Sequence, residues 1–270
     1  MSATLRRALA GVVLGSWVCL PTALQAASAR HSRFGAAPVN AADESVQSPD
    51  VNLGAFDIVF NGSTTIDNRA EFSRDQGYST TLNFSPLPYL RVGVVGDMDA
   101  PPAESLAYDA TALRTSWQLT PRHAWWADLG LFAEYSQAHG KGEPNSFTLG
   151  PTLQKDDAAL FGRQMIYSLN LFMETDVGPN NTGRIGAELN WQGHMAISPY
   201  WQPGIEAYGT VNNIYASSTD REPEWQIGPM ITGSVPGLAS VTYTVTYRFG
   251  LDQAVAHGEV LWRLAYGVRF

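Results

Sequence analysis

The sequence has only one cysteine, no long apolar run after its first segment, and little charge. The one cysteine among the 270 residues is Cys19, which lies inside an N-terminal apolar segment. Ser16-Trp17-Val18 before it does not form a lipobox, so the sequence does not indicate a lipoprotein. A mature chain without cysteine can form no disulfide and no cysteine-ligated metal site, and it has no thiol for catalysis.

No segment after residue 20 has the 18 consecutive apolar residues of a transmembrane helix. If the mature protein enters a membrane, it must do so as a closed β-barrel, because only a closed barrel satisfies every backbone polar group without helices.

Charged residues are also scarce, at 16% of the chain against about 25% in soluble domains. The net charge of −8 excludes nucleic acid as a partner, because phosphate binding needs a basic face. Aromatic residues make up 11% of the chain and there are 25 glycines. A chain rich in aromatics and glycine with few charges is typical of a membrane barrel.

The N-terminus predicts a signal peptide over residues 1–29. Arg6 and Arg7 form a basic start and residues 8–20 an apolar core, which is of signal-peptide length and too short for an uncleaved anchor. Small residues indicate cleavage after residue 26 or residue 29. Residues 30–50 lack periodicity and predict a flexible periplasmic leader, so the barrel is expected over residues 51–270.

The last strand gives the clearest pattern. Between residues 260 and 270, cationic or small residues alternate with an apolar row ending on the final Phe, and alternate side chains of a strand share a face. The row consists of Trp262, Leu264, Tyr266, Val268 and Phe270. A terminal Phe preceded by alternating aromatics resembles the signal read by the bacterial barrel-assembly machinery. The pattern therefore predicts a bacterial outer-membrane protein with that machinery and membrane lipid as partners.

Similar alternation recurs along the mature chain between turn-rich breaks. It predicts an all-β fold, an antiparallel transmembrane barrel of about twelve strands, between 10 and 14. The expected strands are residues 53–60, 78–85, 89–97, 107–119, 125–135, 146–154, 167–174, 184–192, 200–210, 224–233, 241–249 and 260–270. Prolines inside three of them predict bulges or strand ends, since proline removes a ladder donor.

An internal repeat is visible as well. Residues 130–135 followed by Leu149-Gly150-Pro151 are echoed by residues 204–209 followed by Ile227-Gly228-Pro229. Duplicated hairpins would produce this spacing, and so would chance similarity among glycine-rich strands.

The same residues resemble those of a known family. The motifs are Leu90 to Gly93, the Gly-Leu-Phe-Ala-Glu-Tyr run, the two Gly-Pro strands, and residues 247–251. They resemble the outer-membrane barrels of the phenol-degradation MetA-pathway, transporter-like family. The resemblance implies a barrel that admits hydrophobic or aromatic compounds, and it brings no catalytic residues.

The interior is the candidate site. Strand parity turns nine charged residues inward: Arg114, Asp128, Glu134, Glu174, Glu188, Glu206, Arg248, Arg263 and Arg269. Such charges either line a selective pore or pair with one another and fill the interior. Trp126, Phe132, Phe172 and Tyr208 are also expected inward, as a stacking surface for aromatic solutes or as space-filling groups.

No motif indicates catalysis, and neither a metal site nor a cofactor is expected. The five histidines fall in the leader or near predicted turns and match no hydrolase pattern. The favoured function is a passive outer-membrane channel or uptake protein for small solutes, including hydrophobic or aromatic ones, and not an enzyme. The alternatives are a lipid-acting outer-membrane enzyme of the acyl hydrolase type, a structural barrel with a plugged lumen, and a secreted β-sandwich.

Overall fold

The computed structural model describes residues 46–69, 72, 74–140, 142–160, 162–216, 223–251 and 256–270. The predicted signal peptide and residues 30–45 of the predicted leader lie outside this set. The described chain forms twelve strands: β1 (Ala55–Thr65), β2 (Gln76–Leu87), β3 (Leu90–Ala100), β4 (Ala107–Gln118), β5 (Asp128–Ala138), β6 (Asn145–Leu160), β7 (Arg163–Val177), β8 (Ile185–Met195), β9 (Gln202–Val211), β10 (Pro223–Val235), β11 (Leu238–Gly250) and β12 (Gly258–Arg269).

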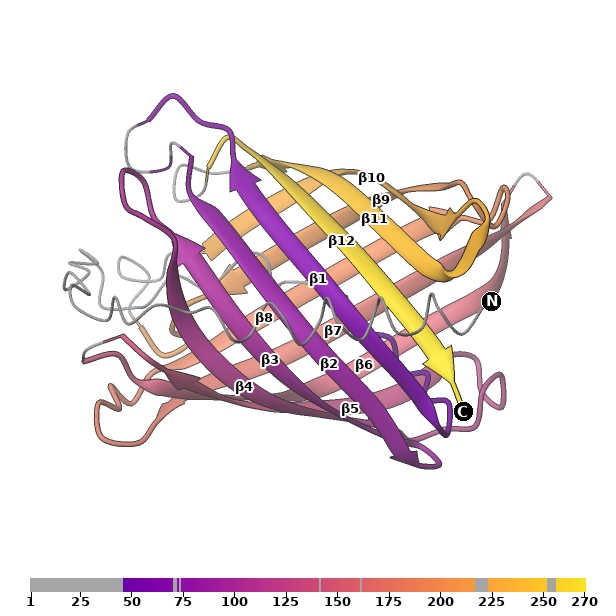
Figure 1. Ribbon diagram of the computed structural model, residues 1–270, viewed down its shortest axis with the longest axis horizontal. Helices are drawn as coiled ribbons and strands as arrows, with labels where there is room; N and C mark the ends of the chain where they lie inside the picture. The colour runs from indigo at the N-terminus through magenta and orange to yellow at the C-terminus, as the bar shows by residue number, and fades with distance from the viewer. Residues whose placement is uncertain are drawn as a thin grey trace, which may run out of the picture. The chain divides into compact units, whose positions relative to one another are not determined.

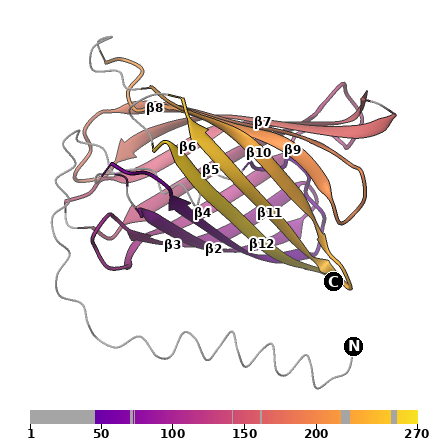
Figure 2. The same cartoon turned by 90° about the horizontal axis from the view of Figure 1, so that it is seen from above.

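The strands close into one antiparallel barrel. Each strand pairs with its neighbours in the chain, and β1 pairs with β12 from Ala55 opposite Arg269 to Thr65 opposite Glu259. The strands run obliquely around the barrel, and the yellow β12 lies beside the indigo β1 at the closing seam (Figures 1 and 2). The predicted fold class and the predicted count of twelve are both confirmed.

The two ends of the barrel have different connections. At one end, which we call the turn end, β2–β3, β6–β7 and β10–β11 are joined by two residues each, and the C-terminus lies there too. At the opposite loop end every connection has at least six residues. Bacterial outer-membrane barrels place short turns in the periplasm and longer loops outside.

Two of the loops are joined at the loop end beside the seam. A carboxylate oxygen of Asp67, after β1, accepts a hydrogen bond from the backbone N–H of His257, before β12, at 2.7 Å. The side chain of Arg69 also donates to this carboxylate, and these bonds hold the pKa of Asp67 well below its usual range. Asp67 therefore remains ionised, and keeps this link between the loops, even in mild acid.

The outward face of the barrel is apolar and is not covered by another sheet. Large side chains such as Leu264, Phe249 and Leu113 are 41%, 49% and 60% exposed. The indole of Trp262 lies over the bare backbone of Gly62, and that of Trp225 over Gly209. Aromatic cover of strand glycines stabilises a sheet surface. A sandwich would bury these rows between two sheets, so the sandwich alternative is wrong. None of the described residues forms a helix long and apolar enough to span a membrane.

The two Gly-Pro strands contain the same local break. Pairing between β6 and β7 skips residues 150–151, and pairing between β10 and β11 skips residues 228–229. Pro lacks the N–H that a regular ladder would need there. At each break a glycine lies against the facing backbone, so a Cβ at Gly150 would fall on the carbonyl oxygen of Leu171, and one at Gly228 on that of Tyr247.

We predict that Gly228→Ala destabilises the barrel by about 3 kcal/mol, the upper range for overpacking, because the added methyl meets backbone that cannot rotate away. Gly267→Ala on β12 is the matched control, since its methyl would come no closer than 3.9 Å to the side chain of Asp57. Denaturant unfolding in detergent micelles, followed by tryptophan fluorescence, measures both variants. Equal stability of the two would contradict the explanation.

Candidate functional site in the barrel lumen

The inward face of the strands is polar and well packed. Across β5 and β4, the guanidinium of Arg114 binds the carboxylate of Glu134, with Nε–Oε2 at 2.7 Å. The guanidinium also lies 5.8 Å from the ring centre of Phe132. Phe132 in turn contacts Phe172 of β7, with ring centres 4.9 Å apart. The two rings meet because Gly150, between them on β6, has no side chain.

The second Gly-Pro strand brings charged side chains together in the same way. Glu206 of β9 and Arg248 of β11 meet beside Gly228, with Arg248 Nε at 3.0 Å from Glu206 Oε1. Thr246 Oγ1 donates to the other carboxylate oxygen at 3.1 Å, and Arg248 lies 5.2 Å from the ring centre of Tyr208. Both partners of this ion pair are nearly inaccessible, with Arg248 1% and Glu206 6% exposed.

A short segment that precedes β1 lies inside the barrel. We call residues 46–51 the luminal segment. Its Gln47 exchanges two hydrogen bonds with the amide of Asn170 on β7, at 2.7 and 2.9 Å. The backbone N–H of Val51 donates to Gln118 at the end of β4, at 3.0 Å. Residues 46–50, which the sequence assigns to a flexible periplasmic leader, are therefore bonded to the barrel wall.

Other inward side chains on the same side of the lumen hold the segment. Arg91 of β3 donates to the carbonyl oxygen of Asp50 at 2.7 Å, and Ser48 donates to Gln154 of β6 at 3.0 Å. Pro49 is fully buried. The luminal segment thus fills the part of the lumen that faces β3, β4, β6 and β7.

The turn end of the segment lies in a charged cluster. Asp50 and Asp156 both lie near the guanidinium of Arg122, at 2.9 and 3.6 Å. Burial raises the pKa of Asp50 above its ordinary value, although Arg122 opposes this shift. His123, Asp128 and Asp156 bring their ligand atoms within 4.8 Å of one another, so these three residues can hold a metal ion. The guanidinium of Arg122 already supplies a positive charge beside one of these ligands, Asp156.

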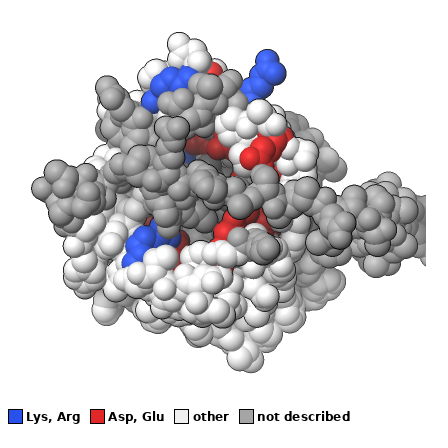
Figure 3. Space-filling view, turned by 90° about the vertical axis from the view of Figure 1, so that its left-hand side faces the viewer, with Lys and Arg blue, Asp and Glu red and all other residues white. Residues whose placement is uncertain are grey.

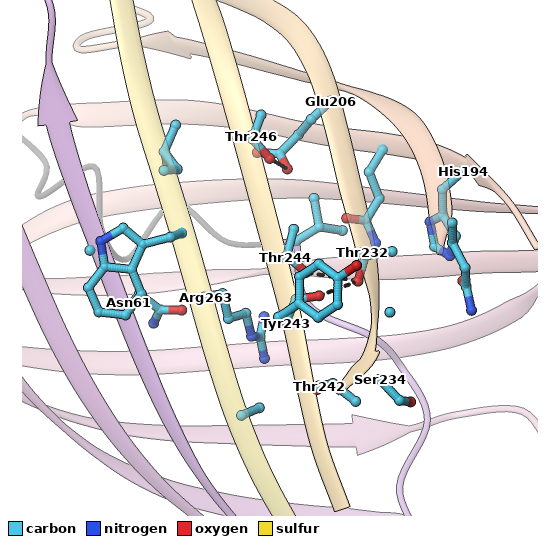
Figure 4. Close-up of a pocket in the computed structure, with 18 of the residues that line it drawn as sticks. Asn61, His194, Glu206, Thr232, Ser234, Thr242, Tyr243, Thr244, Thr246 and Arg263 are labelled. Atoms are coloured by element: carbon cyan, nitrogen blue, oxygen red, sulfur yellow. Dashed lines mark hydrogen bonds between the residues drawn. The ribbon is translucent and has the colours of Figure 1, made fainter. Parts of the chain in front are cut away.

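A cavity of about 340 Å³ remains on the other side of the lumen. Its wall is formed by β1 and by β8 to β12, and Figure 4 shows Asn61, His194, Glu206 and Arg263 around it. Between them the wall carries hydroxyl groups, including Thr232 and Thr244, whose oxygens lie 2.9 Å apart. Most of the residues that line the cavity are therefore polar, although Leu261 and Trp262 also line it.

The loop end of the lumen is acidic. Figure 3 looks onto this end and shows acidic side chains within its hollow. By strand alternation, seven carboxylates in the loop-end half of the barrel face inward. The guanidiniums of Arg184 and Arg248 oppose their negative charge. The carboxylates belong to Asp97, Asp99, Glu174, Asp176, Glu188, Glu224 and Glu259.

The predicted lumen residues occupy different surroundings. Arg114 with Glu134 and Glu206 with Arg248 form ion pairs, and Glu174 forms a third with Arg184, at 3.5 Å. Glu188 accepts from Asn190, and Arg263 lines the cavity. Asp128 accepts from the backbone N–H of His123 at 2.6 Å and so holds the β4–β5 turn, while Arg269 is exposed at the turn end.

The aromatic residues expected inward separate into two groups. Phe132, Phe172 and Tyr208 are buried in the interior, at 4%, 5% and 2% exposed. Trp126 is not in the lumen, and that expectation is wrong: β5 begins at Asp128, so Trp126 lies in the β4–β5 turn and is 70% exposed. Since the buried rings pack on one another and on arginines, they fill space, and none of the three lines the cavity.

The residues of the predicted assembly signal lie on β12 and at the C-terminus. Trp262, Leu264, Tyr266 and Val268 alternate with the inward residues of β12, and Trp262 contacts Tyr78 of β2 with ring centres 6.5 Å apart. Phe270 follows the strand and is 90% exposed. Its backbone N–H donates to the carbonyl of Gly54, which secures the end of the seam.

Three features were not predicted: the luminal segment, its partner Asn170, and the polar cavity with Asn61 and His194. Single amides at inward positions were the signal available in the sequence.

A lipid-acting hydrolase would need a serine and a histidine side chain in contact. The described residues contain no hydrogen bond between a serine and a histidine side chain. The nearest arrangement is His139 Nε2 at 2.8 Å from Thr111 Oγ1, in an exposed position beside Tyr108.

Comparison with known structures identifies the class of fold. The chain is similar to an outer-membrane channel from Pseudomonas putida F1, with a TM-score of 0.54 and 10% identity over 82% of this chain and 97% of that one. It is also similar to CdiB from Acinetobacter baumannii (TM-score 0.46, 10% identity, 79% of this chain and 60% of that one). A third is the translocator domain of the autotransporter NalP from Neisseria meningitidis (TM-score 0.45, 10% identity, 80% of this chain and 87% of that one).

No protein-family model matches the chain, and no curated protein matches its sequence. The fold is that of an outer-membrane β-barrel, as the similarity to the Pseudomonas channel shows. Membership of the phenol-degradation MetA-pathway family, which the motifs resemble, stays a prediction.

Proposed function

We propose that the protein is a passive channel of the bacterial outer membrane for small solutes. The observation that carries this proposal is the polar cavity of about 340 Å³ left open beside the luminal segment. A purely structural barrel has no need of such a space, because paired side chains could fill it. The Pseudomonas channel with the same fold supports the proposal, since that protein is described as a channel.

Single-channel recording of the refolded protein in a planar bilayer tests the proposal, with heat-modifiable gel mobility to confirm the barrel. We expect stable, small conductance steps, because the luminal segment leaves only part of the cross-section open. A folded barrel without conductance would overturn the proposal in favour of a plugged structural barrel. Passive diffusion through a lumen whose wall is fixed by the fold needs no energy source. The conductance steps should therefore appear without any added partner.

The acidic loop end predicts a preference for cations. Inward carboxylates there raise the local concentration of cations, and the effect weakens as salt screens the charges. In a KCl gradient, the reversal potential should show K⁺ to be more permeant than Cl⁻. Neutralising Asp97→Asn and Asp99→Asn together should lower this preference.

Glu104→Gln is the matched control for charge, because Glu104 lies in the loop between β3 and β4, at the same end as Asp97 and Asp99, and is exposed outside the strands. The control should keep the reversal potential of the wild type. An unchanged potential in the Asp97/Asp99 variant would show that the loop end does not set ion preference.

A further inference from the structure

Two buried polar atoms in the cavity wall have no partner among the described residues. Asn61 and His194 are only 5% and 7% exposed, yet Asn61 Oδ1 and His194 Nδ1 form no hydrogen bond. The amide nitrogen of Asn61 is already engaged, because it donates to Ser79 Oγ at 2.8 Å. Buried polar groups in native proteins are almost always paired, so these two atoms indicate an occupant of the cavity.

The hydroxyl groups of the wall also favour a ligand that donates hydrogen bonds. Thr232 Oγ1 donates to the backbone carbonyl of Tyr243 at 2.9 Å. A hydroxyl has a single proton, so the contact of 2.9 Å between Thr232 and Thr244 must use the proton of Thr244. The oxygen of Thr244 is then left to accept, as is Oδ1 of Asn61.

The charges around the cavity favour a neutral ligand. The carboxylate of Glu206 is compensated by Arg248 and Thr246 behind it. An anionic ligand would meet the acceptor oxygens of Asn61 and Thr244, whereas a cationic one would meet the guanidinium of Arg263. A neutral molecule with several hydroxyls satisfies the acceptors without either repulsion.

The size of the cavity limits the ligand. Its volume of about 340 Å³ lies at the lower end of ligand pockets, which span about 300–1,000 Å³. We infer that the cavity is a binding subsite for a small neutral polyhydroxylated solute, of the size of a monosaccharide. This inference rests on the proposed channel function and adds a solute class to it.

Four small probes test the inference: glucose, its anion gluconate, its cationic amine glucosamine, and phenol. Binding is measured by calorimetry on the refolded protein in detergent and by interruptions of the single-channel current. Glucose should bind and interrupt the current, with the other three at least tenfold weaker. Asn61→Leu and His194→Leu should each weaken glucose binding by about tenfold, the change expected for one lost hydrogen bond.

Asn180→Leu at the exposed loop end is the control and should bind glucose as the wild type does. Asn61→Ser and His194→Gln serve where a leucine variant fails to fold, and they should weaken binding less. Equal binding of all four probes, or unchanged glucose binding in the Asn61 and His194 variants, would overturn the inference and leave water as the occupant. Conductance without glucose binding overturns only the subsite, whereas calorimetric glucose binding without conductance overturns only the channel.

Discussion

A variant that begins at Val51 should conduct several times more current per channel than a chain that keeps residues 46–50. The luminal segment occupies the side of the lumen that faces β3, β4, β6 and β7, and its removal opens that cross-section to ions. The variant loses the hydrogen bonds to Asn170, Gln154 and Arg91 and the ion pair of Asp50 with Arg122. None of these contacts joins one strand to another, so the wall should remain folded. Single-channel recording in a planar bilayer measures the change.

Asn170→Ala provides a graded test of the same explanation. It removes both hydrogen bonds to Gln47, each worth about 1 kcal/mol, while the rest of the segment stays attached through Val51 and Asp50. We expect a noisier open level and brief steps to larger current. If the truncated protein conducts like the full chain, the luminal segment does not restrict the path.

Arg248→Met should destabilise the barrel by about 3–5 kcal/mol, the cost of leaving a buried charge without its partner. The variant strands the carboxylate of Glu206, which is 6% exposed. It also removes the cation opposite Glu259 of β12. Glu259 is paired in register with Arg248 and is 2% exposed. Denaturant unfolding in micelles gives the change in the free energy of unfolding.

The double variant Glu206→Gln with Arg248→Met separates charge from packing. It removes both charges of the pair and should recover part of the lost stability, since neutral replacement of a buried ion pair costs little, while Glu259 still lacks the cation of Arg248 opposite it. If the double variant is no more stable than Arg248→Met alone, the loss comes from the missing packing of the guanidinium on Tyr208 and from Glu259, which lacks the cation of Arg248 in both variants.

The sequence predicts the wall of this barrel well because a strand repeats every two residues. Alternation across residues 260–270 and 241–249 therefore assigns each side chain to a face, and the twelve expected strands match the twelve observed. Strand ends are less certain, because alternation can run on into a turn. That is why Trp126 was expected in the lumen although β5 begins at Asp128.

The interior is only partly predictable. Inward parity identifies Glu206 and Arg248, but which charges pair depends on residues such as Gly228 that let strands two apart meet. The luminal segment has no periodicity, and its position depends on single side chains from four strands. The cavity is what remains once these groups have packed, and no local pattern in the sequence encodes such a remainder.

The two Gly-Pro breaks have a consequence for how such a lumen can diversify. The same backbone arrangement brings together two phenyl rings at Gly150 and an ion pair at Gly228. At each break, the two inward side chains that meet over the glycine can therefore be replaced without changing the pairing register of the strands. Replacing the phenyl pair by an ion pair would turn an apolar constriction of the lumen into a charged one, and the opposite replacement would do the reverse. In both cases every strand would keep its neighbours.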